Sequence, residues 1–161
     1  MSDFTIGEEP ADSADVRWCF EQYYTELGTE FGYEVDTALP LDVEQLTRPH
    51  GLVLVIRDDG APVGCGAVKL LGDGIGEIKR MWVSPAARGY GLGGRLLDAL
   101  EAEAAAAGKT ITRLETNDQL EAALAMYRKR GYVEIAPFNE EPFATHWFRK
   151  ALPGARDGVP T

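Results

Sequence analysis

The chain has 161 residues and a mass of 17.6 kDa, the size of one ordinary domain. Hydrophobic residues make up 45% of it and charged residues 26%, a balance typical of a packed globular protein. The 26 acidic and 16 basic residues give a formal net charge of −10. Such a charge repels the phosphates of nucleic acids, so we expect no nucleic-acid partner.

The composition also bears on location and on metal binding. No apolar run approaches the roughly 20 residues of a membrane-spanning helix, and the first residues do not resemble a secretion signal. We therefore expect a cytoplasmic protein without a membrane partner. Cys19 and Cys65 lack metal-ligand spacing, so we expect buried thiols, no disulfide scaffold and no metal. The acidic surface favours cationic ligands, or serves solubility alone.

The first half of the chain predicts an antiparallel meander. Apolar residues recur at helical spacing before Gly28, and later runs are rich in β-branched residues. We expect a strand over 4–6, a helix over 13–27, an irregular segment over 28–40, a short helix over 41–46, and strands over 52–56, 63–71 and 75–83. Gly60 and Gly74 end the two turns that connect these three strands.

The second half changes to alternating helices and strands. Leucines at helical spacing, and glycines after each helical run, set the expected boundaries. We expect helices over 92–107 and 119–130 and strands over 111–116, 132–135 and 143–148. These elements complete a single domain over residues 1–151, followed by a flexible tail over 152–161.

A glycine-rich loop carries the strongest chemical signal. It runs Arg88-Gly-Tyr-Gly-Leu-Gly-Gly94, between a strand that ends at Val83 and a helix that begins near Gly91. Glycines let the backbone approach a ligand, and the successive N–H groups and the helix dipole favour an anion such as a pyrophosphate. The alternative is an ordinary strand-to-helix turn, which rarely needs four glycines in six residues.

The same loop matches the Gly-x-Gly-x-x-Gly pattern of dinucleotide-binding folds, and Glu115 stands where such folds place a ribose-binding acid. In those folds the pattern follows its strand at once, whereas here residues 84–88 intervene. Only 45 residues remain after Thr116, and a meander precedes the loop. A nicotinamide-dependent oxidoreductase is therefore disfavoured.

Residues 77–97 resemble the central motif of the GNAT superfamily of N-acetyltransferases, and Arg88-x-x-Gly91-x-Gly93 matches its Arg/Gln-x-x-Gly-x-Gly/Ala signature. A second motif of the family resembles residues 114–132, and the order of elements agrees from residue 4 to about 150. The resemblance implies an α/β fold with a mixed central sheet. Its antiparallel N-terminal meander would be followed by a βαβ-like half that binds acetyl-CoA.

The resemblance also implies which residues bind acetyl-CoA. Backbone N–H groups of Arg88, Gly89, Tyr90, Gly91, Leu92, Gly93 and Gly94 would hold the pyrophosphate, and pantetheine would lie along Met81, Trp82 and Val83. A backbone N–H near Met81 to Val83 would stabilise the oxyanion. Many members carry an asparagine where this chain has Leu120, so Asn117 is a candidate for the missing contact.

Acetyl transfer needs a neutral amine, so a base has to remove a proton from the ammonium form. Glu77 falls where several family members carry a catalytic glutamate. Strand alternation places it with Lys79 on one face and Arg80 on the other. The alternative is that Glu77 is solvated or paired with one of these two residues.

Tyr127 fits, by family position, the acid that protonates the departing thiolate. The alternative is packing, because Leu120, Ala123, Leu124 and Tyr127 form an apolar helix stripe. We expect no nucleophilic cysteine, since the acetyl group would pass directly from donor to acceptor in a ternary complex.

The acceptor is expected opposite the donor groove, on the first helix and the segment after it. Aromatic and acidic side chains that suit a cation gather there: Tyr23, Tyr24, Glu26, Glu30, Phe31 and Tyr33. An amphipathic helix explains most of them equally well. The acceptor would be a small-molecule or peptide amine: a polyamine, an amino acid, an aminoglycoside, or a protein N-terminus or lysine. The alternative function left open is a non-catalytic acyl-CoA-binding sensor or interaction module of the same fold. For assembly, a homodimer is left open.

Overall fold

The computed structural model describes residues 3–32 and 42–153. Its elements are β1 (Phe4–Glu9), α1 (Ala14–Phe31), η1 (Glu44–Leu46), β2 (Gly51–Asp58), β3 (Ala61–Leu70), β4 (Ile75–Val83), η2 (Pro85–Ala87), α2 (Leu92–Ala106), β5 (Ile111–Thr116), α3 (Glu121–Lys129), β6 (Val133–Ile135) and β7 (His146–Ala151). The strands are hydrogen-bonded in the order β1-β2-β3-β4-β5-β7-β6. The α/β fold with a mixed sheet, expected from the sequence, is confirmed.

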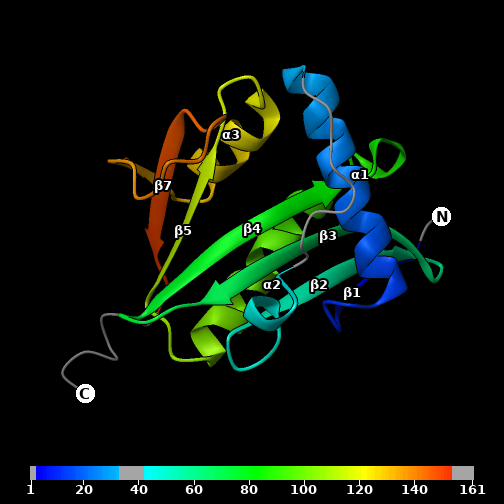
Figure 1. Cartoon of the computed structure of the whole chain (residues 1–161), viewed down its shortest axis with the longest axis horizontal. Helices are drawn as coiled ribbons and strands as arrows, with labels where there is room; N and C mark the ends of the chain where they lie inside the picture. The colour runs from blue at the N-terminus through cyan, green and yellow to red at the C-terminus, as the bar shows by residue number, and fades with distance from the viewer. Residues whose placement is uncertain (1–2, 33–41, 154–161) are drawn as a thin grey trace. The chain divides into compact units, whose positions relative to one another are not determined.

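The chain divides into two compact units: unit 1 comprises residues 1–69 and 78–100, and unit 2 comprises residues 70–77 and 101–161. In unit 1, β1 pairs antiparallel with β2, and β2 with β3. Helix α1 lies across one face of these strands and α2 lies on the opposite face (Figure 1). The expected meander is therefore present.

Two apolar layers hold unit 1 together. On the α1 side, Val16 and Phe20 pack with Val53, Val55 and Ala67 of the sheet, all at most 1% exposed. The expected burial of Cys19 and Cys65 in this layer is confirmed. On the other side, the α2 leucines at helical spacing are fully buried: Leu92, Leu96, Leu97 and Leu100. Each such burial stabilises the fold by about 2 kcal/mol.

Gly66 lets α2 approach β3 closely. A Cβ added to this glycine would lie 2.9 Å from Leu100 Cδ1 and 3.0 Å from Leu96 Cδ2. The absence of a side chain at Gly66 of β3 therefore makes room for the buried leucines of α2.

Unit 2 holds the parallel pair of the sheet. Residues Ile75–Glu77 of β4 pair in parallel with Ile111–Arg113 of β5. Strand β7 then pairs antiparallel with β5 over its whole length, and β6 pairs antiparallel with β7. The sequence pattern predicted β5 correctly.

Several predicted boundaries were wrong. The first helix does not end at Gly28 but continues to Phe31, and Gly32 ends it with φ 74°. Gly28 is buried inside the helix, where glycine costs only about 1 kcal/mol, so it did not stop the chain. The last strand runs over 146–151 instead of 143–148, because its pairing with β5 sets its register. Much of the segment expected to be irregular, residues 33–41, lies outside the described residues.

The end of the chain also differs from expectation. Leu152, placed by the sequence at the start of a flexible tail, is 3% exposed, and its N–H donates to Thr110 O at 2.9 Å. Leu152 therefore packs with unit 2, because an apolar side chain directly after β7 reaches its core. Residues 154–161 of the expected tail lie outside the described residues.

Candidate active site

The glycine loop of unit 1 adopts backbone conformations that favour glycine. Gly89 has φ 93° and Gly91 has φ 74°, and both residues are exposed. A Cβ added at either position would meet no atom within 4 Å. The loop therefore requires glycine for its left-handed backbone, and the space in front of these two residues is open.

Helix α2 begins directly after the loop. Its first hydrogen bond runs from Arg95 N to Gly91 O at 3.2 Å. The N–H groups of Leu92, Gly93 and Gly94 therefore belong to the first turn, which has no preceding carbonyl of its own to pair with. This positive end of the helix dipole suits an anion. The loop residues expected to bind a pyrophosphate fit that ligand.

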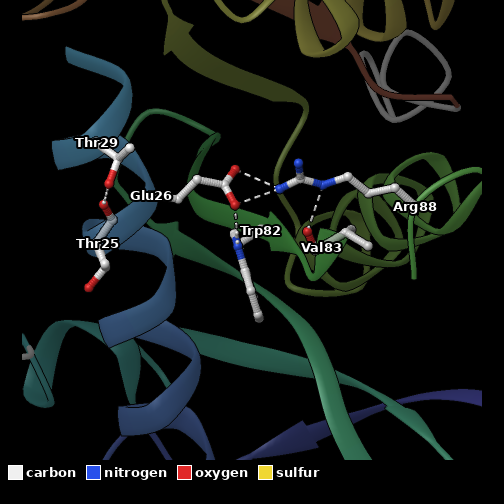
Figure 2. A network of polar contacts seen from close by, with 6 residues as sticks. All are labelled: Thr25, Glu26, Thr29, Trp82, Val83 and Arg88. Atoms are coloured by element: carbon white, nitrogen blue, oxygen red, sulfur yellow. Dashed lines mark hydrogen bonds and ion pairs between the residues drawn. The ribbon is translucent and has the colours of Figure 1, made fainter. Parts of the chain in front are cut away.

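The side chain of Arg88 turns back from the loop. Its Nε donates to Val83 O at 2.9 Å, and its Nη2 donates to Glu26 Oε1 at 2.7 Å. The same Glu26 oxygen accepts from Trp82 Nε1 at 3.2 Å. Figure 2 shows the carboxylate of Glu26, from α1, between the indole and the guanidinium. Two residues expected at the donor site, Trp82 and Arg88, thus contact one α1 side chain.

The end of β4 is anchored by Trp82. This residue is 7% exposed, and its ring makes an edge contact with Trp18, with centroids 5.7 Å apart. Met81 and Val83, on either side of it, are partly exposed. The strand therefore presents both residues at a fixed position next to the turn that leads into the loop.

Strand β4 is not regular at Arg80, where φ is 55°. Its guanidinium donates to Tyr24 OH at 2.7 Å and to Asp42 Oδ2 at 2.8 Å, and it lies over the Phe20 ring. Burial lowers the pKa of Arg80, but the charges and hydrogen bonds of Tyr24 and Asp42 together outweigh it, so the pKa is raised. The regular alternation expected along this strand therefore breaks at Arg80, because its side chain is held by α1 and by Asp42.

In unit 2, Glu77 has a partner that the sequence did not suggest. The Nε of Arg113 donates to Glu77 Oε1 at 2.9 Å, and Arg113 Nη2 lies 2.8 Å from the same oxygen. The sequence considered only Lys79 and Arg80 as partners of this carboxylate. Glu77 is 8% exposed, and the guanidinium of Arg113 lies 4.1 Å from the centre of the Phe138 ring.

Tyr127 lies in the core of unit 2. It is 7% exposed and makes ring contacts with Tyr132 and Phe148, at centroid distances of 5.9 and 6.4 Å. Burial, followed by the negative charge of Glu115, raises the pKa of the Tyr127 hydroxyl well above its ordinary value. The hydroxyl therefore keeps its proton at neutral pH, as an acid must before it acts. The contacts also fit the packing alternative.

Asn117 uses its side chain within unit 2. Its Nδ2 donates to Phe143 O, and its Oδ1 accepts from Gln119 N at 2.8 Å. This turn leads into α3, whose N-cap position, Leu120, offers no side-chain hydrogen bond. Asn117 thus takes part in the local turn, and a contact with CoA stays a prediction.

Sequence reasoning missed a polar chain beside β5. Asn139 Nδ2 donates to Glu115 Oε1 at 2.6 Å, and Asn139 Oδ1 accepts from Trp147 Nε1 at 2.9 Å. Glu115 was considered only as a ribose-binding acid. Because Asn139 lies 24 residues from Glu115, no local motif signals their contact.

The residues expected to form an acceptor site are only partly brought together. Tyr23 and Tyr24 make an edge contact at 5.0 Å between centroids, but Tyr24 OH also accepts from Arg80. Glu26 faces Arg88 and Trp82, while Glu30 is exposed. Tyr33 lies outside the described residues.

The described residues contain neither a metal-binding cluster nor a membrane-spanning helix. Over residues 3–32 and 42–153, no group of three or more His, Cys, Asp or Glu side chains could hold a metal ion. Within that same part of the chain, no helix is long and apolar enough to cross a membrane.

Comparison with known proteins identifies the family. The model of the acetyltransferase (GNAT) family matches residues 15–132. An IAA acetyltransferase of Azospirillum brasilense is 39% identical over 142 residues, which cover 86% of this chain and 90% of that protein. A crystal structure assigned as an acyl-CoA N-acyltransferase of Klebsiella pneumoniae is 33% identical with a TM-score of 0.78, and covers 92% of this chain and 97% of that one.

A third relative shows the fold at lower identity. An acetyltransferase of Salmonella typhimurium, solved with its cofactor acetyl-CoA, has a TM-score of 0.69 and 21% identity, over 94% of this chain and 95% of that one. The family match spans both the glycine loop and Tyr127, so the sequence expectation is confirmed at the level of the family. The chain belongs to the GNAT family of acetyltransferases and is an acyltransferase enzyme.

Proposed function

We propose that this enzyme transfers an acetyl group from acetyl-CoA to a primary amine by direct attack in a ternary complex. The observation that carries the donor assignment is the loop from Arg88 to Gly94. It combines two left-handed glycines, open space in front of them and the N-terminal turn of α2. The Salmonella typhimurium relative, solved with acetyl-CoA, supports the same donor.

The loop would bind the donor through its backbone. N–H groups of Gly89 to Gly94 would donate to the pyrophosphate oxygens, and Met81 to Val83 would lie along the pantetheine. Bound in this way, acetyl-CoA supplies an activated thioester. The acidic chain as a whole repels an anionic donor, so the oriented N–H groups and the dipole of α2 have to provide the attraction locally.

Glu77 and Tyr127, the residues expected from the resemblance to the family, would supply the proton transfers. Glu77 would take the proton that the ammonium group of the acceptor loses, directly or through water. The amine nitrogen then forms a bond to the thioester carbon, and the carbon–sulfur bond breaks. Tyr127, whose hydroxyl stays protonated, would give its proton to the departing sulfur. The nitrogen loses its second proton to solvent as the intermediate collapses, and exchange with solvent after release of the products restores the Tyr127 proton and removes the one on Glu77.

The acceptor would be a small-molecule or peptide amine. The aromatic residues Tyr23 and Tyr24 and the exposed Glu30 on α1 support a cationic acceptor. A cytoplasmic location and assembly as a homodimer stay predictions.

An acceptor panel tests the proposal. Acetyl-CoA is incubated with a polyamine, amino acids, an aminoglycoside and a lysine peptide, and the released thiol is measured. We expect thiol release with at least one amine, and thermal protection by acetyl-CoA but not by NAD or NADP. Protection without turnover on any amine would instead support a non-catalytic acyl-CoA sensor, and protection by NAD alone would refute the donor assignment.

A further inference from the structure

Glu26 of α1 connects three parts of unit 1. Its carboxylate accepts from Trp82 Nε1 at the end of β4 and from Arg88 Nη2 at the start of the glycine loop. Arg88 also donates through Nε to Val83 O. One carboxylate and one guanidinium therefore connect helix α1, the end of β4 and the first loop residue (Figure 2).

The ion pair of Glu26 and Arg88 affects the geometry of the loop more than the stability of the fold. Both Glu26 oxygens accept from Arg88 Nη2, while Arg88 Nε is used for Val83 O. The side chains are 42% and 49% exposed, so solvent screens their attraction and the pair adds little to the stability of the fold. A guanidinium with donors in a fixed plane nevertheless sets the direction of two bonds at once.

Fixing Arg88 has a consequence for the loop. Residue 88 precedes Gly89 and Gly91, and glycine, which lacks a Cβ, has more accessible backbone conformations than any other residue. Anchoring the residue before these glycines limits the conformations that the following N–H groups can reach. A loop held in this way loses less conformational freedom when an anion binds.

We propose that Glu26 is a positioning residue for the donor loop: through Arg88 it holds the backbone N–H groups of residues 89–94 in the arrangement that binds the pyrophosphate of acetyl-CoA. This inference rests on the proposed use of acetyl-CoA. It also gives Glu26 a task different from the one expected of it in the acceptor site.

Electrostatics alone predicts that Glu26→Gln strengthens the binding of acetyl-CoA, the opposite of what a positioning role predicts. The chain carries a net charge of −10 and acetyl-CoA is an anion, so removing any carboxylate near the loop should favour binding. If Glu26 positions the loop, Glu26→Gln should weaken binding instead. Glutamine keeps the volume and an oxygen for Trp82 but loses the charge that holds Arg88.

The experiment measures acetyl-CoA binding by calorimetry for the wild type, Glu26→Gln, Arg88→Gln and the double variant. Glu21→Gln, which removes the same charge from an exposed site on the same helix, is the matched control. We expect Glu26→Gln to raise the Kd and the KM for acetyl-CoA about fivefold or more, with kcat within about twofold. Glu21→Gln should bind as well as the wild type, or slightly more tightly.

The double variant tests whether Glu26 influences acetyl-CoA binding through Arg88. If Glu26 acts through Arg88, adding Glu26→Gln to Arg88→Gln should change the Kd by less than about twofold. A Kd for Glu26→Gln equal to or below that of the wild type would overturn the inference, as would a full fivefold loss in the Arg88→Gln background. Failure of the wild type to bind acetyl-CoA would overturn the proposed function itself, a different outcome.

Discussion

Glu77 and Arg113 form an ion pair in unit 2, with Arg113 Nη2 2.8 Å from Glu77 Oε1 and Arg113 Nε 2.9 Å from the same atom. The two residues lie 36 positions apart and meet because the first residues of β4 pair in parallel with those of β5. The pair fixes the orientation of the carboxylate. Glu77 therefore has a structural role, and a test of catalysis has to distinguish the loss of this ion pair from the loss of a base.

Glu77→Gln should lower turnover mainly below pH 8 and leave the affinity for acetyl-CoA nearly unchanged. An amide has about the same volume but cannot take the proton that the ammonium group must lose, and this loss is hardest at low pH. The measurement is kcat between pH 6 and 9, together with the Kd for acetyl-CoA.

Arg113→Gln provides the matched control, since it removes the same ion pair from the other side. Both variants should lose about 1.5 to 3 kcal/mol of stability, the usual size of a hydrogen bond to a charged group. Glu77→Gln should lose turnover mainly below pH 8, whereas Arg113→Gln, which keeps the carboxylate, should keep turnover there. If both variants share one profile, or if Glu77→Gln keeps that of the wild type, Glu77 is not the base.

The sequence predicted those parts of the fold and site that are local. The glycine loop, the buried leucines of α2 and the meander each follow from residues close in the chain, and the structure contains all three. Turn chemistry was also readable: Gly60 and Gly74 both have positive φ where a turn was expected.

What the sequence could not predict depends on distant residues. Arg88 and Glu26 are 62 positions apart, and Arg80 reaches Tyr24 across 56 positions. Arg80 has a left-handed backbone, and because the residue is not a glycine, the sequence gives no signal of this conformation. Gly28 shows the reverse error, because burial against neighbouring residues kept a poor helix former inside α1.

Gly91→Asp should abolish thermal stabilisation by acetyl-CoA. Gly91 has φ 74°, which strains an aspartate, but its surroundings are open, so the side chain would place a carboxylate where the N–H groups would bind pyrophosphate. The wild type should gain about 2.7 kcal/mol at a ligand concentration 100 times the Kd. The measurement is the Tm with and without acetyl-CoA.

Gly91→Asn separates charge from backbone strain. Asparagine and aspartate tolerate the left-handed region similarly, but asparagine is neutral. It should keep part of the stabilisation that aspartate loses. Equal protection of the wild type and the aspartate variant would show that the loop does not bind the donor.

The buried tyrosine predicts how stability depends on alkaline pH. Burial raises the pKa of Tyr127 above the ordinary value of 10.0, so near pH 10 and above the folded chain keeps a proton that the unfolded chain loses. The unfolded state then binds fewer protons, and the free energy of unfolding falls as pH rises above about 10. Urea unfolding at pH 9 and pH 10.5 should show a smaller loss in Tyr127→Phe than in the wild type. An equal loss in both would mean that Tyr127 ionises normally in the fold.

Tyr127→Phe also separates catalysis from packing at neutral pH. The variant keeps the ring contacts with Tyr132 and Phe148, so packing alone predicts a loss of no more than about 1 kcal/mol of stability and an unchanged kcat. If the hydroxyl protonates the departing sulfur, kcat should fall by roughly 10² or more while the Tm barely moves. We expect the second result, because Tyr127 matches the position of the acid in the resemblance to the family.

Measuring Tm and kcat on one preparation decides between the two roles of Tyr127. Tyr132→Phe is the comparison, since Tyr132 is also buried but hydrogen-bonds Thr112 and Glu101 inside the core. That variant should lose stability and keep kcat, the reverse of Tyr127→Phe. Full activity in Tyr127→Phe would remove it as the acid. A loss of only a few fold would mean that solvent also reaches the sulfur, which is tolerable because a thiolate, with an ordinary pKa of about 8.5 for its acid, leaves readily without help.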